Sequence, residues 1–386
     1  MMKLLTAFGF IFLQPVLWIG IIRTFLNSKN RIKQNRNQFR TAIFSHHYEL
    51  KNLVINFIIL GMILSIISAV IGLTLPLSWV IGYEIILLVS LVIIPWNVFP
   101  ITISIGTLIG FILFHLNLNL TTKINLPFNM NWRLSNEANA LFFVALLLFA
   151  TWMFFNFTGG NYNTPKIYRN RRNVRIAGYP FKELSIIPMF TLIPGTWVHL
   201  VIPFWPILNF NGHTFSFMFL PVIVGLKLTI FNDVPKHEMK ALSKRILKLC
   251  FFSVVLAIIS CFYPIVTIYS LILIGLVYWI MILNTMHNNH PGNSIYSEVI
   301  NGVRIVGIKP HSPASKMNIE IGDVILDVNH LKVNNENSFY EALLKHPTYC
   351  HLRVLDRNNR IKLTSTAIYN NSPHELGIVI FENHHN

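Results

Sequence analysis

Long apolar runs separated by short polar segments fill the chain as far as about residue 283. Runs of roughly 18 or more apolar residues with almost no charge are typical of transmembrane helices. The pattern therefore predicts a polytopic α-helical membrane region of about nine spans, with seven to nine compatible with the runs. The predicted spans are 4–26, 53–75, 80–94, 99–116, 140–155, 184–208, 215–231 and two within 249–283.

The run 184–208 differs from the others because it contains four prolines, Pro188, Pro194, Pro203 and Pro206. Proline removes a backbone donor and kinks a helix, and neighbouring segments must satisfy the groups that are freed. A straight helix is therefore not expected here, and a broken or re-entrant helix is the alternative.

Three strongly basic segments lie between the apolar runs, and we expect them to be cytoplasmic loops because such loops are enriched in Lys and Arg. Their basic residues are Lys29, Arg31, Lys33, Arg36 and Arg40; Lys166, Arg169, Arg171, Arg172, Arg175 and Lys182; and Lys236, Lys240, Lys244, Arg245 and Lys248. With nine spans, all three loops and the C-terminal tail fall on the same side. The first span then places the N-terminus outside, unless that span only lies in the membrane interface.

Composition agrees with a membrane protein: 53% of the residues are hydrophobic and 12% are charged, with a mean hydropathy of +0.53. The formal net charge of +16 lies entirely in the first 289 residues, because residues 290–386 hold nine basic and nine acidic side chains. Basic loops explain this charge better than nucleic-acid binding does, and they also favour contact with anionic lipid headgroups.

From about residue 286 the composition changes to that of a soluble α+β domain. Alternating apolar and polar positions in HLRVLDR and RIKLTST predict half-buried antiparallel strands, joined by a turn at 357–360. The predicted strands are 303–308, 324–328, 332–333, 350–356, 361–366 and 376–381, with helices at 312–317 and 337–345.

Residues for catalysis or metal binding are missing from the pattern. His237 and Glu238 begin an HExxH-like stretch, but the second His is absent. Glu84, His115 and His199 lie near span ends, where packing or interface placement explains them better than a site does. The three cysteines show no paired spacing and the histidines are scattered, so we expect no catalytic residue, no metal site and no cofactor.

The stretch SPASKMNIEIGDVILDVNHLKV resembles the middle of a bacterial PDZ domain. Ser312-Pro313-Ala314 opens a short helix, and Gly322-Asp323 precedes the strand that begins at Val324. Pro313 suits a first helical position, and Gly322 allows a turn with positive φ. The resemblance covers about residues 302–382 and implies a PDZ domain of the permuted bacterial type.

A PDZ domain binds an extended peptide as an added strand between a sheet edge and a helix. The resemblance places the carboxylate loop and the edge strand at Glu375, Leu376, Gly377, Ile378, Val379 and Ile380. It places the facing helix at 337–345, where Phe339, Ala342 and Leu343 are pocket walls or, alternatively, core residues. Because Glu375 carries a negative charge beside the loop, an internal segment or a folded partner's strand is an alternative to a free C-terminus.

A multi-span region without protease residues, followed by one permuted PDZ domain, resembles the MinJ family of cell-division topological determinants of Gram-positive bacteria. GIKPHSPASKM, FYEALLKH and HELGIVI carry most of this resemblance. The predicted domains are a membrane domain at 1–283, a linker at 284–300 and a cytoplasmic PDZ domain at 301–386. The resemblance implies a non-enzymatic scaffold at septum and poles that links DivIVA-like to MinD-like proteins and contacts the divisome. The alternative is a transporter or an accessory subunit of a membrane protease, which the proline-containing run favours.

Overall fold

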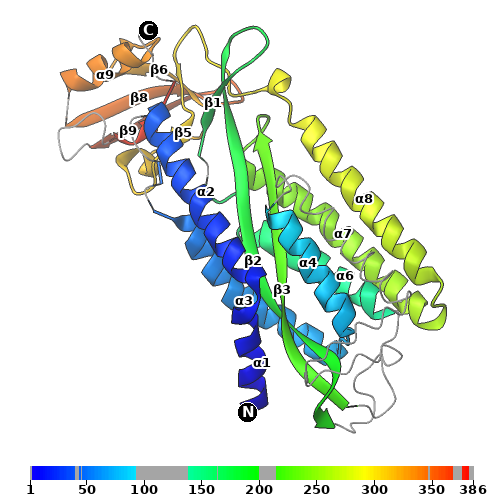
Figure 1. Ribbon diagram of the computed structural model, residues 1–386. Helices are drawn as coiled ribbons and strands as arrows, with labels where there is room; N and C mark the ends of the chain where they lie inside the picture. Colours follow the sequence, from blue (N-terminus) through cyan, green and yellow to red (C-terminus); the bar gives the residue numbers. More distant parts are fainter. Residues whose placement is uncertain are drawn as a thin grey trace.

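The computed structural model describes residues 2–39, 43–44, 46–92, 138–162, 164–199, 214–346, 348–367 and 376–381. A long helical platform carries a small mixed domain at one end, and the N-terminus lies at the other end (Figure 1). The platform helices are α1 (Met2–Leu13), α2 (Pro15–Phe39), α3 (Tyr48–Ile71), α4 (Leu77–Val92), α6 (Ala138–Phe157), α7 (Pro235–Phe262) and α8 (Val266–Asn288).

Four of these helices, α3, α6, α7 and α8, are long and apolar enough to cross a membrane. The pair α1 and α2, bent by 54° where Pro15 begins the second helix, adds a fifth candidate if it is one broken span. The nine predicted spans are therefore not confirmed for the described residues. The predicted span 80–94 corresponds to the shorter helix α4, and the predicted span 99–116 lies outside the described residues.

The prediction of helical spans at 184–208 and 215–231 was wrong, because the described parts of both runs are strands. β2 (Arg175–His199) and β3 (Thr214–Ile230) form a long antiparallel hairpin, and β1 (Lys166–Arg169) pairs with the beginning of β2. A strand that is buried on both faces reads as a continuous apolar run, which hydropathy alone does not distinguish from a buried helix. The prolines fit this arrangement because each long strand of the hairpin has a free edge, and Pro188 lies opposite Pro221.

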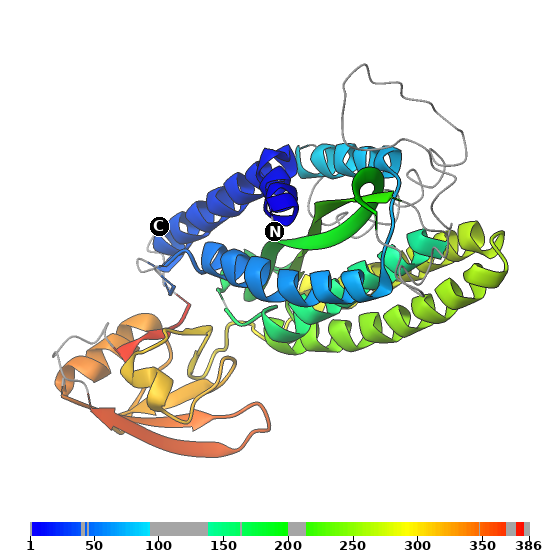
Figure 2. The ribbon, with the colours of Figure 1, turned by 90° about the horizontal axis from the view of Figure 1, so that it is seen from below.

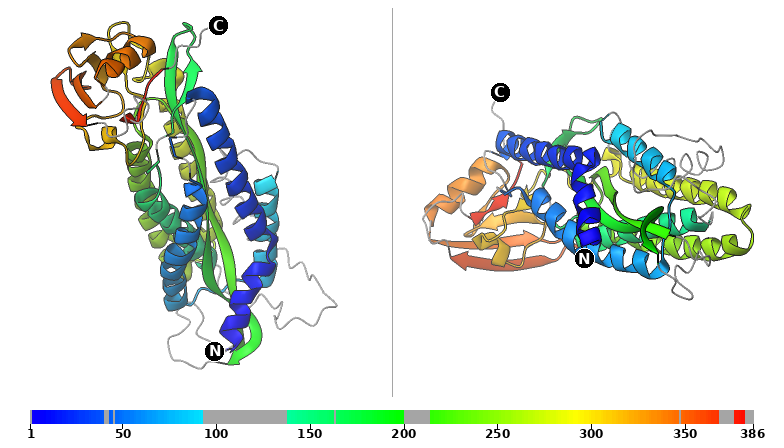
Figure 3. Two further views of the ribbon diagram at one scale, coloured as in Figure 1. Left: turned by 90° about the vertical axis from the view of Figure 1, so that its left-hand side faces the viewer. Right: turned by 60° about the horizontal axis from the view of Figure 1, so that its bottom comes forward.

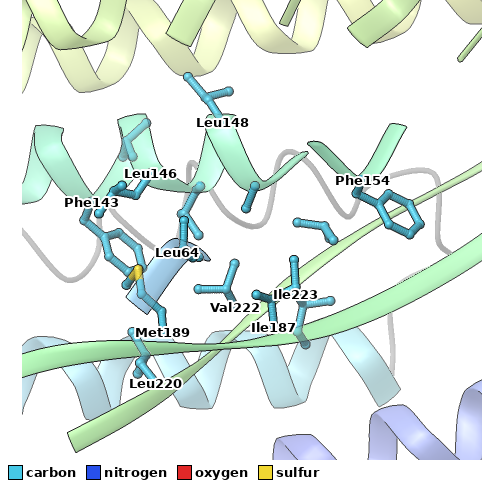
Figure 4. Close-up of a cluster of buried hydrophobic side chains, with 14 of the residues drawn as sticks. Leu64, Phe143, Leu146, Leu148, Phe154, Ile187, Met189, Leu220, Val222 and Ile223 are labelled. Atoms are coloured by element: carbon cyan, nitrogen blue, oxygen red, sulfur yellow. The ribbon is translucent and has the colours of Figure 1, made fainter. Parts of the chain in front are cut away.

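The hairpin lies in the middle of the platform, with helices around it (Figure 2). Side chains of α6 and of both strands meet in the main hydrophobic core, which includes Phe143, Ile187, Met189 and Val222 (Figure 4). Helix α6 is largely buried, whereas α3, α7 and α8 each expose an apolar face of the kind that lipid covers.

Hydroxyl groups of α3 satisfy the free edge of β2. Ser65 Oγ donates to the carbonyl oxygen of Pro188 over 3.2 Å and accepts from the amide of Phe190 over 3.1 Å, and Ser68 Oγ donates to the carbonyl oxygen of Phe190. Close approach is possible because Gly61 has no side chain; a Cβ there would lie 2.6 Å from Pro188 Cγ. A buried backbone group without a hydrogen-bond partner costs about 1 to 3 kcal/mol or more, so these contacts stabilise the edge of β2 that β3 leaves unpaired.

The basic segments are not the loops that were predicted. Lys29 to Arg36 lie in the second half of α2, and Lys236 to Lys248 lie in the first half of α7. Only the middle segment contains a connecting turn, and it forms a hairpin of β1 with the beginning of β2. All three segments nevertheless lie at the end of the platform that carries the small domain (Figures 1 and 3).

The small domain follows the predicted pattern closely. Its elements are β4 (Val303–Arg304), β5 (Gly307–Ile308), a 3₁₀ turn η4 (Pro313–Lys316), β6 (Val324–Val328), β7 (Leu331–Lys332), α9 (Glu336–Lys345), β8 (Tyr349–Leu355), β9 (Ile361–Ala367) and β10 (Ile378–Val379). One sheet has the order β4-β6-β8-β9 with β7 beside β6, and a second pairs β10 with β5. A further 3₁₀ turn, η3 (Pro291–Asn293), lies between α8 and this domain. The domain boundaries proposed from the sequence remain a prediction.

Candidate peptide-binding site

The last strand, β10, lies at an edge of the small domain. It pairs antiparallel with β5, Ile378 opposite Ile308 and Val379 opposite Gly307. Among the described residues no strand pairs with its other side. In an antiparallel pair, alternate residues direct their backbone groups to alternate sides, and the carbonyls of Gly377 and Val379 accept from β5 and its neighbours. The backbone groups of Ile378 and Ile380 therefore face the unpaired edge.

Side chains along β10 alternate between two hydrophobic clusters. Ile378 and Ile380 lie in the core of the small domain, whereas Val379 and Phe381 lie in a cluster shared with the platform. This second cluster, which we call the docking cluster, comprises Phe39, Ile43, Ala177, Tyr179, Tyr296, Val306, Val379 and Phe381. The edge strand is thus held from both faces, and its residues are buried.

Helix α9 begins with a capping box. Asn335 Oδ1 accepts from the amide of Ser338 over 2.8 Å, and Ser338 Oγ accepts from the amide of Asn335 over 3.1 Å. Phe339, Ala342 and Leu343 follow at the spacing of one helix face and are almost completely buried. They lie in the same core as Ile378 and Ile380, so this face anchors α9 in the domain.

Gly377 is in a position that only glycine fits. Its φ is +82°, and a Cβ there would lie 2.3 Å from Ser312 Oγ. Its carbonyl oxygen accepts from the amide of Lys309 over 2.8 Å, and Ser312 Oγ donates to the carbonyl oxygen of Lys309 over 2.6 Å. The loop before β10 is therefore tied to the segment that begins the domain.

The structure brings Leu376, Ile378, Ile380 and the three α9 residues into one buried cluster, while Val379 faces the platform. Glu375 lies outside the described residues. Sequence reasoning missed Lys309 and Ser312, which stand beside the loop in space but more than 60 positions before it in the chain. No periodic pattern connects them to Gly377, so only the pairing of β5 with β10 reveals them.

The contact between platform and small domain was also missed. The amide of Ala177 donates to the carbonyl oxygen of Tyr296 over 2.9 Å, and the Arg175 guanidinium pairs with Glu298, with Nε 2.8 Å from Oε2. The beginning of β2 therefore pairs antiparallel with the segment around Ser297, through an isolated bridge at Ile176, and the sequence presents that segment only as part of a polar linker.

Arg357 of the β8–β9 turn closes the other side of this contact. Its guanidinium donates to the Tyr296 hydroxyl over 2.6 Å and lies 3.5 Å from Asp233, just before α7. Burial raises the pKa of the Tyr296 hydroxyl to about 12, so it stays protonated at physiological pH. Burial likewise raises the pKa of the Cys350 thiol to about 12, which makes that cysteine an unreactive core residue.

Metal-ligating side chains do not gather in the part of the chain that the structure describes: no three His, Cys, Asp or Glu residues form a group there. The site consists of a backbone edge, a helix and a glycine loop. This is the arrangement by which an extended peptide is added to the edge of a sheet.

Taken with the apolar helices, the site defines a class of protein: a platform with helices long and apolar enough to cross a membrane, which carries a PDZ domain at one end. A family model described as PDZ domain matches residues 282–360. The match ends before the loop at Gly377 and strand β10, which complete the domain from the far end of the chain, as in a permuted order.

The similar proteins match this chain over nearly its full length, and the descriptions of all three name the same kind of protein. The chain is 25% identical over 384 residues to "Cell division topological determinant MinJ" of Bacillus subtilis (strain 168), covering 98% of this chain and 94% of that protein. It is 24% identical over 386 residues to proteins of Lacticaseibacillus paracasei and Lacticaseibacillus casei (strain BD-II), each described as "Probable cell division topological determinant MinJ", covering 95% of either chain. These comparisons support a MinJ-like protein.

Proposed function

We propose that this chain is a non-catalytic membrane scaffold that acts in division-site selection and recruits partners through its PDZ domain. The observation that carries the proposal is the unpaired edge of β10, which lies beside α9 and is positioned by Gly377. The relatives are named as cell division topological determinants, and a protein that marks a place needs an anchor and a binding surface rather than chemistry.

The partner we propose is a division-site protein that offers an extended segment. Main-chain hydrogen bonds to Ile378 and Ile380 supply affinity in this mode, and alternate side chains supply specificity. Exposed Lys309 stands beside the loop and favours an acidic segment or a carboxylate. By resemblance to MinJ, DivIVA-like and MinD-like proteins and components of the divisome are the first candidates.

We propose a multi-pass topology with the PDZ domain in the cytoplasm and the protein concentrated at septum and poles. Support comes from the three basic segments, which all lie at the PDZ end of the platform. Basic segments stay on the cytoplasmic side and attract anionic headgroups there. The described part of the run that favoured a transporter, residues 184–199, is a strand with hydrogen bonds to α3 rather than a broken helix, which supports the scaffold over that alternative.

A localisation experiment tests this function. The full-length chain, fused to a fluorescent protein, should form a band at the septum or poles, whereas Gly377→Val should give uniform membrane fluorescence with an unchanged amount of protein in the membrane. Gly292→Val is the matched control, because a Cβ at Gly292 meets no atom within 4 Å. Localisation that persists in Gly377→Val would contradict binding through this edge, and uniform fluorescence of the unchanged chain would contradict the scaffold.

A further inference from the structure

A polar cavity lies between α2 and the PDZ end of the hairpin, where the rest of the platform is packed with apolar side chains. Its volume is about 120 Å³. The lining comprises Asn27, Asn30, Arg31, Gln34, Asn35, Gln38, Tyr48, Glu49, Thr164, Pro165, Lys166, Pro180 and Lys182. Exposed Asn30 and Gln34 form its rim, so the cavity is reached from the polar side of α2.

The helix face that turns toward the hairpin changes character along α2. At Gly20 it is apolar and close: a Cβ there would lie 2.4 Å from the end of Ile186. About two to four turns later the same face presents Asn27, Arg31 and Asn35, at the spacing of a buried helix stripe. A polar stripe directed inward is costly unless something satisfies it.

Two of these amides lack a partner. Asn35 is 4% exposed, and its Nδ2 has no hydrogen-bond partner within the described residues; Asn27 Nδ2 is in the same condition. Buried amide donors nearly always have partners, so this polar stripe is poorly satisfied by the protein itself.

Two lysines that line the cavity lack acidic partners. Neither Lys166 nor Lys182 forms an ion pair in the described part of the chain, although Lys166 lies over the Tyr168 ring at 5.4 Å. Lys182 on β2 is directly opposite Lys227 on β3, a like-charge pair that destabilises a sheet. Burial, then Lys227 and Lys166, lower the pKa of Lys182, which is the response of a cation that lacks a counter-ion.

The remaining charges in the cavity cancel each other. Arg31 Nε lies 2.6 Å from Glu49 Oε1, and the guanidinium also donates to the carbonyl oxygens of Phe44 and His46. These contacts hold Arg31 in the lining of the cavity and neutralise its charge. The two lysines therefore give the cavity a net positive charge.

We propose that this cavity binds a phosphate group, with Lys182 and Lys166 as its cations. The position at the PDZ end of α2, beside the basic segments, suits the headgroup of an anionic phospholipid as well as free phosphate. This assignment is independent of the peptide-binding proposal, because no residue of β10 or α9 lines the cavity.

Thermal unfolding of the full-length chain tests the site. In neutral detergent, inorganic phosphate is titrated; in nanodiscs, phosphatidylglycerol is compared with phosphatidylcholine. Lys182→Gln should weaken the stabilising response about tenfold, the value of one charge-assisted hydrogen bond. Lys240→Gln, an exposed lysine of α7 with the same change in charge, should leave the response unchanged.

Stability without any anion separates a binding defect from misfolding. Because Lys182 faces Lys227, Lys182→Gln should raise the unfolding temperature in phosphatidylcholine while it weakens the response to anions. If both probes raise the unfolding temperature, free phosphate is sufficient for binding. If only phosphatidylglycerol does, the ligand is the lipid headgroup. Either result supports the site. The proposal is overturned if neither probe raises the unfolding temperature of the chain, or if Lys182→Gln responds to the anions as Lys240→Gln does. Either result would mean that the cavity holds only water.

Discussion

The hydroxyl of Tyr179, near the beginning of β2, donates a hydrogen bond of 2.8 Å to the carbonyl oxygen of Val306 in the PDZ domain. The amide of Val306 in turn donates to the carbonyl oxygen of Val379 over 2.8 Å. One side chain of the platform hairpin is therefore two hydrogen bonds away from the strand that forms the candidate peptide edge.

Tyr179→Phe should loosen the PDZ domain from the platform. The substitution keeps the ring in the docking cluster but leaves the buried carbonyl of Val306 without its partner, at a cost of about 1 to 3 kcal/mol. Hydrogen exchange followed by mass spectrometry should show faster exchange at 303–308 and 376–381, with α3 and α7 unchanged. Tyr269→Phe is the control, because Tyr269 is exposed on α8; equal exchange in both variants would mean that the bond does not fasten the domain.

The Phe339→Ala substitution tests whether Phe339 forms a wall of the peptide pocket or belongs to the hydrophobic core. Phe339 is 1% exposed within the PDZ core, so its truncation should destabilise the PDZ domain by about 3 to 5 kcal/mol. Chemical unfolding followed by circular dichroism measures this, with exposed Leu344→Ala on the same helix as the control. Normal stability with impaired partner binding would instead assign Phe339 to the groove.

Gly61→Val should separate α3 from the hairpin. The new side chain meets Pro188, and the contact cannot relax without moving the serine hydroxyls off the edge of β2. We expect the unfolding temperature in detergent to fall by several degrees, as a change of 1 to 3 kcal/mol does in a domain of about this size. Gly9→Val is the control, since a Cβ at Gly9 has no atom within 4 Å; a similar fall in both would show that the close approach has no special value.

Asp356 should make the β8–β9 hairpin sensitive to acid. Hydrogen bonds from the amides of Arg360 and Asn358 to its carboxylate lower the pKa of Asp356 below its ordinary value of 3.8. A depressed folded pKa contributes stability above the unfolded value, and this contribution is lost as pH falls through the folded value. Asp356→Asn should therefore be less stable than the parent at pH 7 and approach it near pH 2 in a denaturant titration. A constant difference across this range would show that the carboxylate charge is not the cause.

The PDZ domain could be predicted from sequence because its signals are local. Alternation predicted the strands at 350–356 and 361–366, and Gly322 and Pro313 lie where the turn and helix chemistry requires them. The likeness to MinJ was also available from sequence, and the comparisons bear it out. Only the pairing of β10 with β5, which joins segments 70 residues apart, depended on the family pattern.

The platform could not be predicted in the same way, because hydropathy measures burial and does not report backbone pairing. The run 215–231 was predicted as a span from its hydropathy, yet its backbone groups pair with β2. The prolines were the available signal: Pro188 excluded a straight helix, and a strand with a free edge explains it better than a broken helix does. The docking cluster left no signal, because Tyr179 and Tyr296 are single aromatic residues in unrelated segments.

The hairpin also has a mechanical meaning. β2 continues for 25 residues, roughly 80 Å of extended backbone, from the docking cluster to the opposite end of the platform. An extended strand paired along its length hardly stretches, so it acts as a strut rather than a tether. We expect a displacement of the hairpin at the end of the platform opposite the PDZ domain to displace Tyr179 and the docking cluster, because the paired strand between them cannot lengthen to absorb it.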